Sequence, residues 1–253
     1  MRAHSPLWVI AATILSTACV VAACEPESTK RSATTAAFST EQGTVVDFPL
    51  ALGNTWVYSG TFYQGFNQDT VLTATYTVTE TVVDVLSSEL KPHRVFQIAR
   101  SEEVRSCPDQ WLEQPENWCA RTDVDEPTYH WYAVDESTLY HQRRLEIYQL
   151  PERSIREMVF PLAEGEAWYL TTEMAETYPD QAADSMLRKV EEEGPRELPS
   201  GAFEACFRMT ETIGGSGGVT WYCSRIGIVE RSTDHRGTPF GSREVLIDYA
   251  FPR

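Results

Sequence analysis

The feature that most constrains the fold of this chain is an alternation of side chains with a period of two. Between Val71 and Val85, threonines alternate with apolar or aromatic residues such as Tyr76 and Val78. Successive side chains of a strand point to opposite faces, whereas a helical face repeats every 3.6 residues. Similar segments occur at 94–101, 129–134, 138–143, 203–212, 219–224, 226–234 and 243–251. The pattern predicts an antiparallel all-β fold with at most one short helix or turn, near residues 181–184.

A nine-residue phrase occurs twice. Residues 48–56, from Phe48 to Trp56, return 112 residues later as residues 160–168, from Phe160 to Trp168, with six positions identical. Proline fixes φ, glycine permits a tight turn, and tryptophan fills a core. We therefore interpret both copies as turns followed by a core anchor, not as active-site motifs.

The N-terminal segment predicts export. Arg2 and His4 precede an apolar stretch, Leu7 to Ala18, which is too short to span a bilayer about 30 Å thick. The sequence Val21-Ala22-Ala23-Cys24 resembles the lipobox of bacterial lipoproteins, in which the cysteine is acylated. Cys19 is a poorer second candidate, and an ordinary signal peptide is the alternative. We expect a signal peptide at 1–23 and an acyl anchor on Cys24 that holds the chain on the outside of a bacterial membrane.

The segment after Cys24 predicts a flexible tether, since residues 24–44 are rich in Ser, Thr, Ala and Glu and poor in large apolar residues. Residues 45–253 are predicted to form a single β domain. The formal net charge is -16. Because polyanions would be repelled, nucleic acid is not an expected partner.

Four further cysteines suggest disulfide bonds in an exported chain. The simplest of the three pairings joins Cys107 to Cys119 and Cys206 to Cys223, the second across a Gly-rich turn. A zinc site using all four thiolates is the competing idea, but the chain has no Cys-x-x-Cys motif.

The order of several short motifs is similar to that of a broad set of uncharacterised bacterial lipoproteins. The motifs are the two Pro-Leu-x-x-Gly-x-x-Trp phrases, Pro199-Ser200-Gly201-Ala202-Phe203 before Cys206, and Trp221-Tyr222 before Gly227-Ile228-Val229. The resemblance implies a curved antiparallel sheet or half-barrel, with a β-sandwich as the alternative. It implies no catalytic residues. Arg225-Ile226 departs from the turn that the family pattern carries.

Two groups of residues are candidates for chemistry. Ser216 lies in a Gly-x-Ser-x-Gly sequence, but the residues after it follow a strand pattern and not the helix that a nucleophile elbow needs. His130 and His141 lie on opposite arms of a predicted hairpin, and pairing of Tyr132 with His141 would make them diagonal neighbours. They could bind a metal ion, but the sequence defines no third ligand. We therefore predict no catalytic, cofactor-binding or metal-binding residues.

The sequence favours a noncatalytic, lipid-anchored envelope module that binds an apolar ligand or an envelope partner protein. An extracytoplasmic hydrolase or metal-dependent enzyme is the alternative and would need His130 or Ser216 in a cleft with an acidic partner. A purely structural surface protein is the third reading. Trp111 and Trp118, in the predicted Cys107–Cys119 loop, are expected to cover the core.

Overall fold

The computed structural model describes residues 38–39, 45–67, 70–88, 91–113, 126–135, 137–142, 155–171, 186–213, 216–235 and 237–252. The predicted signal peptide, Cys24, Cys119, Trp118 and the predicted helix or turn at 181–184 lie outside the described residues. Residues 33–253 form one compact unit. No helix in the described part of the chain is long and apolar enough to cross a membrane.

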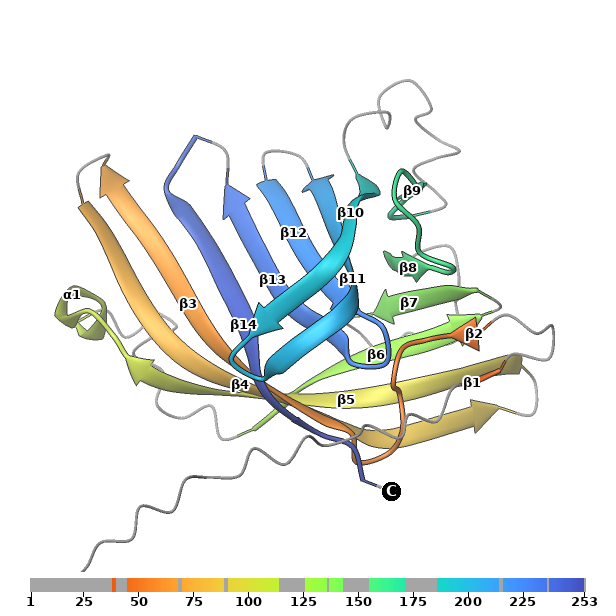
Figure 1. The fold of residues 1–253 in the computed structure, drawn as a ribbon. Coiled ribbons are helices and arrows are strands. Elements are labelled where there is room, and N and C mark those ends of the chain that lie inside the picture. The colour runs from red at the N-terminus through yellow and green to blue at the C-terminus, as the bar shows by residue number, and fades with distance from the viewer. Residues whose placement is uncertain are drawn as a thin grey trace, which may run out of the picture. The chain divides into compact units, whose positions relative to one another are not determined.

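The chain folds into one large antiparallel sheet, which confirms the predicted all-β class and the predicted curved sheet or half-barrel (Figure 1). The described strands are β1 (Phe38–Ser39), β2 (Val45–Val46), β3 (Thr55–Asn67), β4 (Thr70–Ser88), β5 (Lys91–Ser106), β6 (Thr128–Asp135), β7 (Thr138–Gln142), β8 (Ile155–Val159), β9 (Ala167–Tyr169), β10 (Leu187–Leu198), β11 (Gly201–Ile213), β12 (Ser216–Cys223), β13 (Gly227–His235) and β14 (Phe240–Ala250). The short helix α1 (Asp109–Leu112) follows β5. β1 and β2 pair only with each other among the described strands.

The twelve-stranded sheet consists of two six-stranded meanders. Its order is β8-β7-β6-β5-β4-β3-β14-β13-β12-β11-β10-β9, so β3 to β8 form one half and β9 to β14 the other. The halves pair directly through β3 and β14. At the other end, the edge strands meet where the Arg156 amide donates to the Leu170 carbonyl oxygen at 2.7 Å. The curvature therefore nearly closes the sheet into a barrel, and Figure 1 shows β8 and β9 beside each other.

The repeated phrase opens each half with the same turn. In the first copy the Asn54 amide donates to the Ala51 carbonyl oxygen at 3.0 Å, and in the second Glu166 donates to Ala163 at 3.1 Å. The third residue of each turn is a glycine with φ of +83° or +90°. Such a φ is strained for any residue with a Cβ atom. The predicted turn geometry is thus confirmed in both copies.

Each turn is fixed to a neighbouring strand in the same way. The Gly53 amide donates to the Val82 carbonyl oxygen on β4 at 2.8 Å, and Gly165 donates to Val190 on β10 at 2.9 Å. Both valines are fully buried. The tryptophan that ends each phrase is also buried and pairs across the ladder with Glu80 or Arg188. The two halves therefore begin with equivalent backbone geometry.

An aromatic and aliphatic core fills part of the space inside the sheet. Phe48 stacks on Tyr132 and Tyr222, with ring centroids 5.8 and 5.9 Å apart. The indole of Trp56 donates to the Ile226 carbonyl oxygen at 2.6 Å. Phe48, which precedes β3, is therefore part of the core.

The disulfide predicted between Cys206 and Cys223 is present. These residues lie opposite each other on β11 and β12, with Cα atoms 4.0 Å apart. The bond joins the strands of the hairpin that carries Ser216, as the sequence predicted. The Cys107–Cys119 bond stays a prediction, because Cys119 lies outside the described residues.

One local expectation was wrong. The strand predicted at 94–101 is longer at both ends, since β5 runs from Lys91 to Ser106 and pairs with β4 over this range. Trp111 lies on α1, almost fully buried against Phe62 and Ala74, so it covers the core as expected.

The turn glycines allow a direct test of the duplicated geometry. We expect Gly165→Ala to reduce the free energy of unfolding by about 1–2 kcal/mol, because a Cβ atom is strained at its φ although no atom lies within 4 Å. Gly53→Ala should cost more, since its Cβ would also lie 3.0 Å from Pro252. Urea denaturation measures both.

Gly194→Ala is the matched control, because Gly194 lies outside the left-handed region and its Cβ would also meet no atom within 4 Å. Its effect should stay within about 0.5 kcal/mol of the native chain or be slightly stabilising. Equal effects at Gly165 and Gly194 would contradict the turn assignment.

Candidate functional site

A cavity of about 350 Å³, lined by both charged and apolar side chains, lies inside the curved sheet. Both halves contribute, since its lining residues come from β4 to β8 and from β10 to β14, together with Leu170 after β9. The charged lining residues are four glutamates and three arginines: Glu80, Glu157, Glu211, Glu244, Arg100, Arg188 and Arg231. A volume of this size lies in the range of small-molecule sites.

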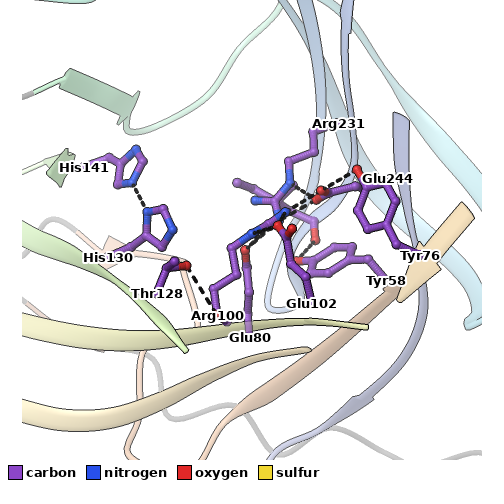
Figure 2. A network of polar contacts seen from close by, with 11 residues as sticks. Tyr58, Tyr76, Glu80, Arg100, Glu102, Thr128, His130, His141, Arg231 and Glu244 are labelled. Atoms are coloured by element: carbon purple, nitrogen blue, oxygen red, sulfur yellow. Dashed lines mark hydrogen bonds and ion pairs between the residues drawn. The ribbon is translucent and has the colours of Figure 1, made fainter. Parts of the chain in front are cut away.

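Arg100 and Arg231 lie at the centre of the first ion-pair cluster (Figure 2). Glu80 accepts from Arg100 at 2.8 Å and from Arg231 at 2.6 Å. Glu244 contacts the same two guanidinium groups and accepts from the Tyr76 hydroxyl at 3.0 Å. Four strands, β4, β5, β13 and β14, are therefore joined through two arginines.

Burial and the neighbouring positive charges shift the pKa values of these carboxyl groups in opposite directions. Burial alone would raise the pKa of Glu244, but Arg231 and Arg100 outweigh it and hold this pKa at about 2. The pKa of Glu80 is also lowered, because the same two arginines overcome its desolvation. Both glutamates are therefore ionised at neutral pH, and both are paired.

Arg188 forms the second cluster. It is almost completely buried, with a side-chain exposure of 5%. Its Nη1 atom lies 3.1 Å from Glu157 Oε1, and its Nε atom donates to Glu211 Oε2 at 3.0 Å. Nη1 also donates to the Glu157 carbonyl oxygen. Arg188 thus joins β10 to β8 and β11, close to the seam between the edge strands.

The two clusters occupy equivalent places in the two halves with the charges exchanged. Glu80 lies opposite Trp56 in the first half, and Arg188 lies opposite Trp168 in the second. The next strand supplies the opposite charge in each case: Arg100 pairs in register with Glu80, and Glu211 pairs with Arg188. The repeated turn therefore positions one buried ion pair in each half.

The two histidines come together at the cavity wall, as the diagonal arrangement predicted. Tyr132 pairs with His141, and His130 Nδ1 lies 3.2 Å from His141 Nε2. The other ring nitrogen of His141, Nδ1, lies 3.9 Å from Glu157 Oε2. The Tyr132 ring stacks on that of His141 with a centroid distance of 5.0 Å. Figure 2 shows the histidine pair beside the Arg100 cluster.

Burial and the neighbouring His141 lower the pKa of His130 to about 4. Its ring is therefore neutral at pH 7 and can be hydrogen-bonded to His141 without charge repulsion. Glu157 also has a lowered pKa, since Arg188 and then His141 outweigh the effect of its burial. A polar chain thus runs from His130 through His141, Glu157 and Arg188.

Ser216 does not belong to the cavity. It begins β12 and pairs with His235 on β13, and it is absent from the cavity lining. The strand that follows it confirms the hairpin interpretation of the Gly-x-Ser-x-Gly sequence. In the described part of the chain, no group of three or more His, Cys, Asp or Glu side chains is arranged to hold a metal ion.

The ion-pair residues were missed by the sequence reasoning. Glu80, Arg100 and Arg188 occur at alternating strand positions, where a charge is ordinarily solvated. The available signal was that Glu80 and Arg188 each stand two residues before a buried valine of the duplicated unit. That spacing places them on the same face as the core.

No family model and no curated protein matches the chain. Two solved structures are similar to it: a protein of Bacteroides fragilis, provisionally described as exported and with a YmcC-like fold, and one of Parabacteroides distasonis, provisionally described as a lipoprotein. Each match has a TM-score of 0.42, covers 81% of this chain and 98% of the other, and has 10% or 11% sequence identity. Similarity at this level supports no conclusion about this chain.

Removal of Arg188 should strongly destabilise the protein. We expect Arg188→Met to lower the free energy of unfolding by about 3–5 kcal/mol, because the buried Glu157 and the half-buried Glu211 would lose their shared partner. Arg105→Met is the control, since Arg105 and Glu103 form a pair that is more than half exposed. That change should cost less than about 1 kcal/mol by denaturant unfolding. Similar losses in both variants would contradict the buried arrangement.

Glu244 gives a pH-dependent prediction. Its pKa is about 2 in the folded protein against an ordinary value of 4.5, so the unfolded chain binds more protons between these values. Its stabilising contribution is therefore complete above about pH 4.5 and is lost as the pH falls toward 2. The stability difference between the native chain and Glu244→Gln should shrink over this window. A difference that is independent of pH would contradict the ion pairing.

Proposed function

We propose that the protein is an extracytoplasmic lipoprotein, anchored through Cys24, that holds a small polar molecule inside its curved sheet. The anchor is supported by the lipobox-like sequence before Cys24 and the apolar segment that precedes it. The binding role is supported by one observation, the cavity of about 350 Å³ lined from both halves. Membership in the lipoprotein family that the motifs resemble is part of this proposal.

The lining favours a polar ligand over the apolar one that the sequence suggested. An apolar molecule would remove water from guanidinium and carboxylate groups without replacing their hydrogen bonds, which is costly. Hydroxyl groups of Thr220, Ser232 and Ser242 and the histidine pair also line the cavity. These groups offer both donors and acceptors to a ligand with hydroxyl or amide groups.

The glutamates and arginines of the lining are already paired with one another, so they do not demand a charged ligand. They instead provide a fixed polar wall, because ion pairs join β4 to β5 and β13, and β8 to β10. A preorganised wall reduces the ordering cost of binding. We therefore propose selective retention of a small molecule without catalysis.

The enzyme alternative keeps one specific observation in its favour. His130 lies in a cavity, and its partner His141 has Glu157 beside its second nitrogen. Ser216 gives no such support, because it does not line the cavity. A hydrolase or metal-dependent enzyme would thus use the histidine pair. An envelope partner protein and a purely structural role are the remaining outcomes.

Native mass spectrometry of the protein purified from its own membrane tests the proposal. We expect a mass increase from acyl chains on Cys24 and one co-purifying polar molecule per chain. Thr220 is buried and lines the cavity, so Thr220→Phe should fill part of it and remove the bound molecule. Thr73→Phe places the same ring on an exposed strand position and should leave it bound.

The outcomes separate the two parts of the proposal. A chain without acyl groups would overturn the anchor, while the cavity result would still stand. A co-purifying lipid would favour the apolar version and overturn the polar one. If Thr220→Phe did not affect binding, the molecule would lie outside the cavity. A cavity that retains only water would favour a structural role.

A further inference from the structure

We propose that His130 and His141 form a binding site for one divalent transition-metal ion of the class that imidazole prefers, such as Zn²⁺ or Cu²⁺. This site goes beyond the proposed retention of a polar molecule and does not depend on it. The inference rests on the geometry of the two facing nitrogens, on the carboxylate behind one of them, and on the space in front of them.

The distance between the facing nitrogens matches that of two ligands on one ion. His130 Nδ1 and His141 Nε2 are 3.2 Å apart. Zinc–nitrogen bonds of 2.0–2.1 Å at a tetrahedral angle separate two nitrogens by about 3.3 Å. An ion can therefore replace the proton between the rings when each ring turns so that its lone pair points to the ion, without a change in the distance between the two nitrogens.

The strands hold the rings in place. His130 and His141 come from neighbouring strands, β6 and β7, whose register is fixed by five paired positions. The rings are tilted by 32° with centroids 5.3 Å apart, and Tyr132 stacks on His141 at 16°. Ligands on rigid strands lose little freedom when the ion binds.

Glu157 lies on the side of His141 where metal-binding histidines ordinarily have a carboxylate. Its Oε2 atom lies 3.9 Å from His141 Nδ1, the ring nitrogen that faces away from His130, which is too far for a direct hydrogen bond. Its negative charge still favours the tautomer with the proton on Nδ1, in which Nε2 carries the lone pair that an ion needs. Arg188 holds the other carboxylate oxygen at 3.1 Å. The orientation of His141 is therefore supported by a buried ion pair.

The cavity leaves room for the rest of the coordination sphere. Within the described part of the chain, no third side chain completes the site, so water or a small molecule in the cavity would take the open positions. The charged groups of the lining are paired with one another, so the choice of ion rests on the imidazole ligands. An open site with two imidazole ligands fits zinc and copper better than magnesium or calcium.

Isothermal titration calorimetry of the tag-free full chain with Zn²⁺ tests the site. We expect one ion per chain, and at least a tenfold weaker affinity in His130→Gln and in His141→Gln. Glu157→Gln should weaken it less than either histidine variant, because Glu157 acts on His141 through its charge and not through a direct hydrogen bond. His235→Gln is the matched control, because His235 is exposed at the end of β13 and does not line the cavity. Thermal unfolding of each variant checks that it is folded.

Electron paramagnetic resonance with Cu²⁺ provides a test on the unaltered chain. The spectrum should show coupling to two imidazole nitrogens at one ion per chain. The absence of a stoichiometric ion, coupling to a single nitrogen, or an equal loss of affinity in His235→Gln would each overturn the site. Failure of the polar-ligand test in the native mass spectra would leave this result unchanged.

Discussion

The structure depends on the pairing of charges inside the curved sheet. Glu80, Arg100, Arg231 and Glu244 would each cost several kcal/mol if buried alone. Together they neutralise one another and join four strands. Because guanidinium and carboxylate groups keep fixed hydrogen-bonding distances, this region cannot collapse into a close-packed apolar core. The cavity and the histidine pair lie beside these charges, where the apolar core ends.

The duplicated turn explains why the charges meet where they do. Each half starts with a glycine turn fixed to a buried valine, and two residues before that valine stands the charged residue that faces inward. In the first half this residue is Glu80, and in the second it is Arg188. The inward residue is negative in the first half and positive in the second, and in each half the next strand supplies the opposite charge. Near-closure of the sheet at β8 and β9 then brings Glu157 to Arg188.

Local sequence patterns predicted the strands, the turns and the close contacts, but not the site. The threonine alternation predicted β4, and the Gly-rich turn predicted the Cys206–Cys223 bond. The predicted hairpin placed His130 beside His141. The ion pairs were not predictable, because Arg100 and Glu244 lie 144 residues apart and meet only after the sheet curls. A period of two assigns a charge to one face of a strand, but curvature decides whether that face is enclosed.

A double-mutant cycle between Arg231 and Glu244 tests the buried pairing most directly. The variants Arg231→Met, Glu244→Gln and the double substitution would be compared by urea denaturation at neutral pH. We predict a coupling energy of about 1.5–3 kcal/mol that changes little with added salt, because the pair is enclosed. A coupling energy near zero, or one abolished by salt, would show that these charges are not paired inside the sheet.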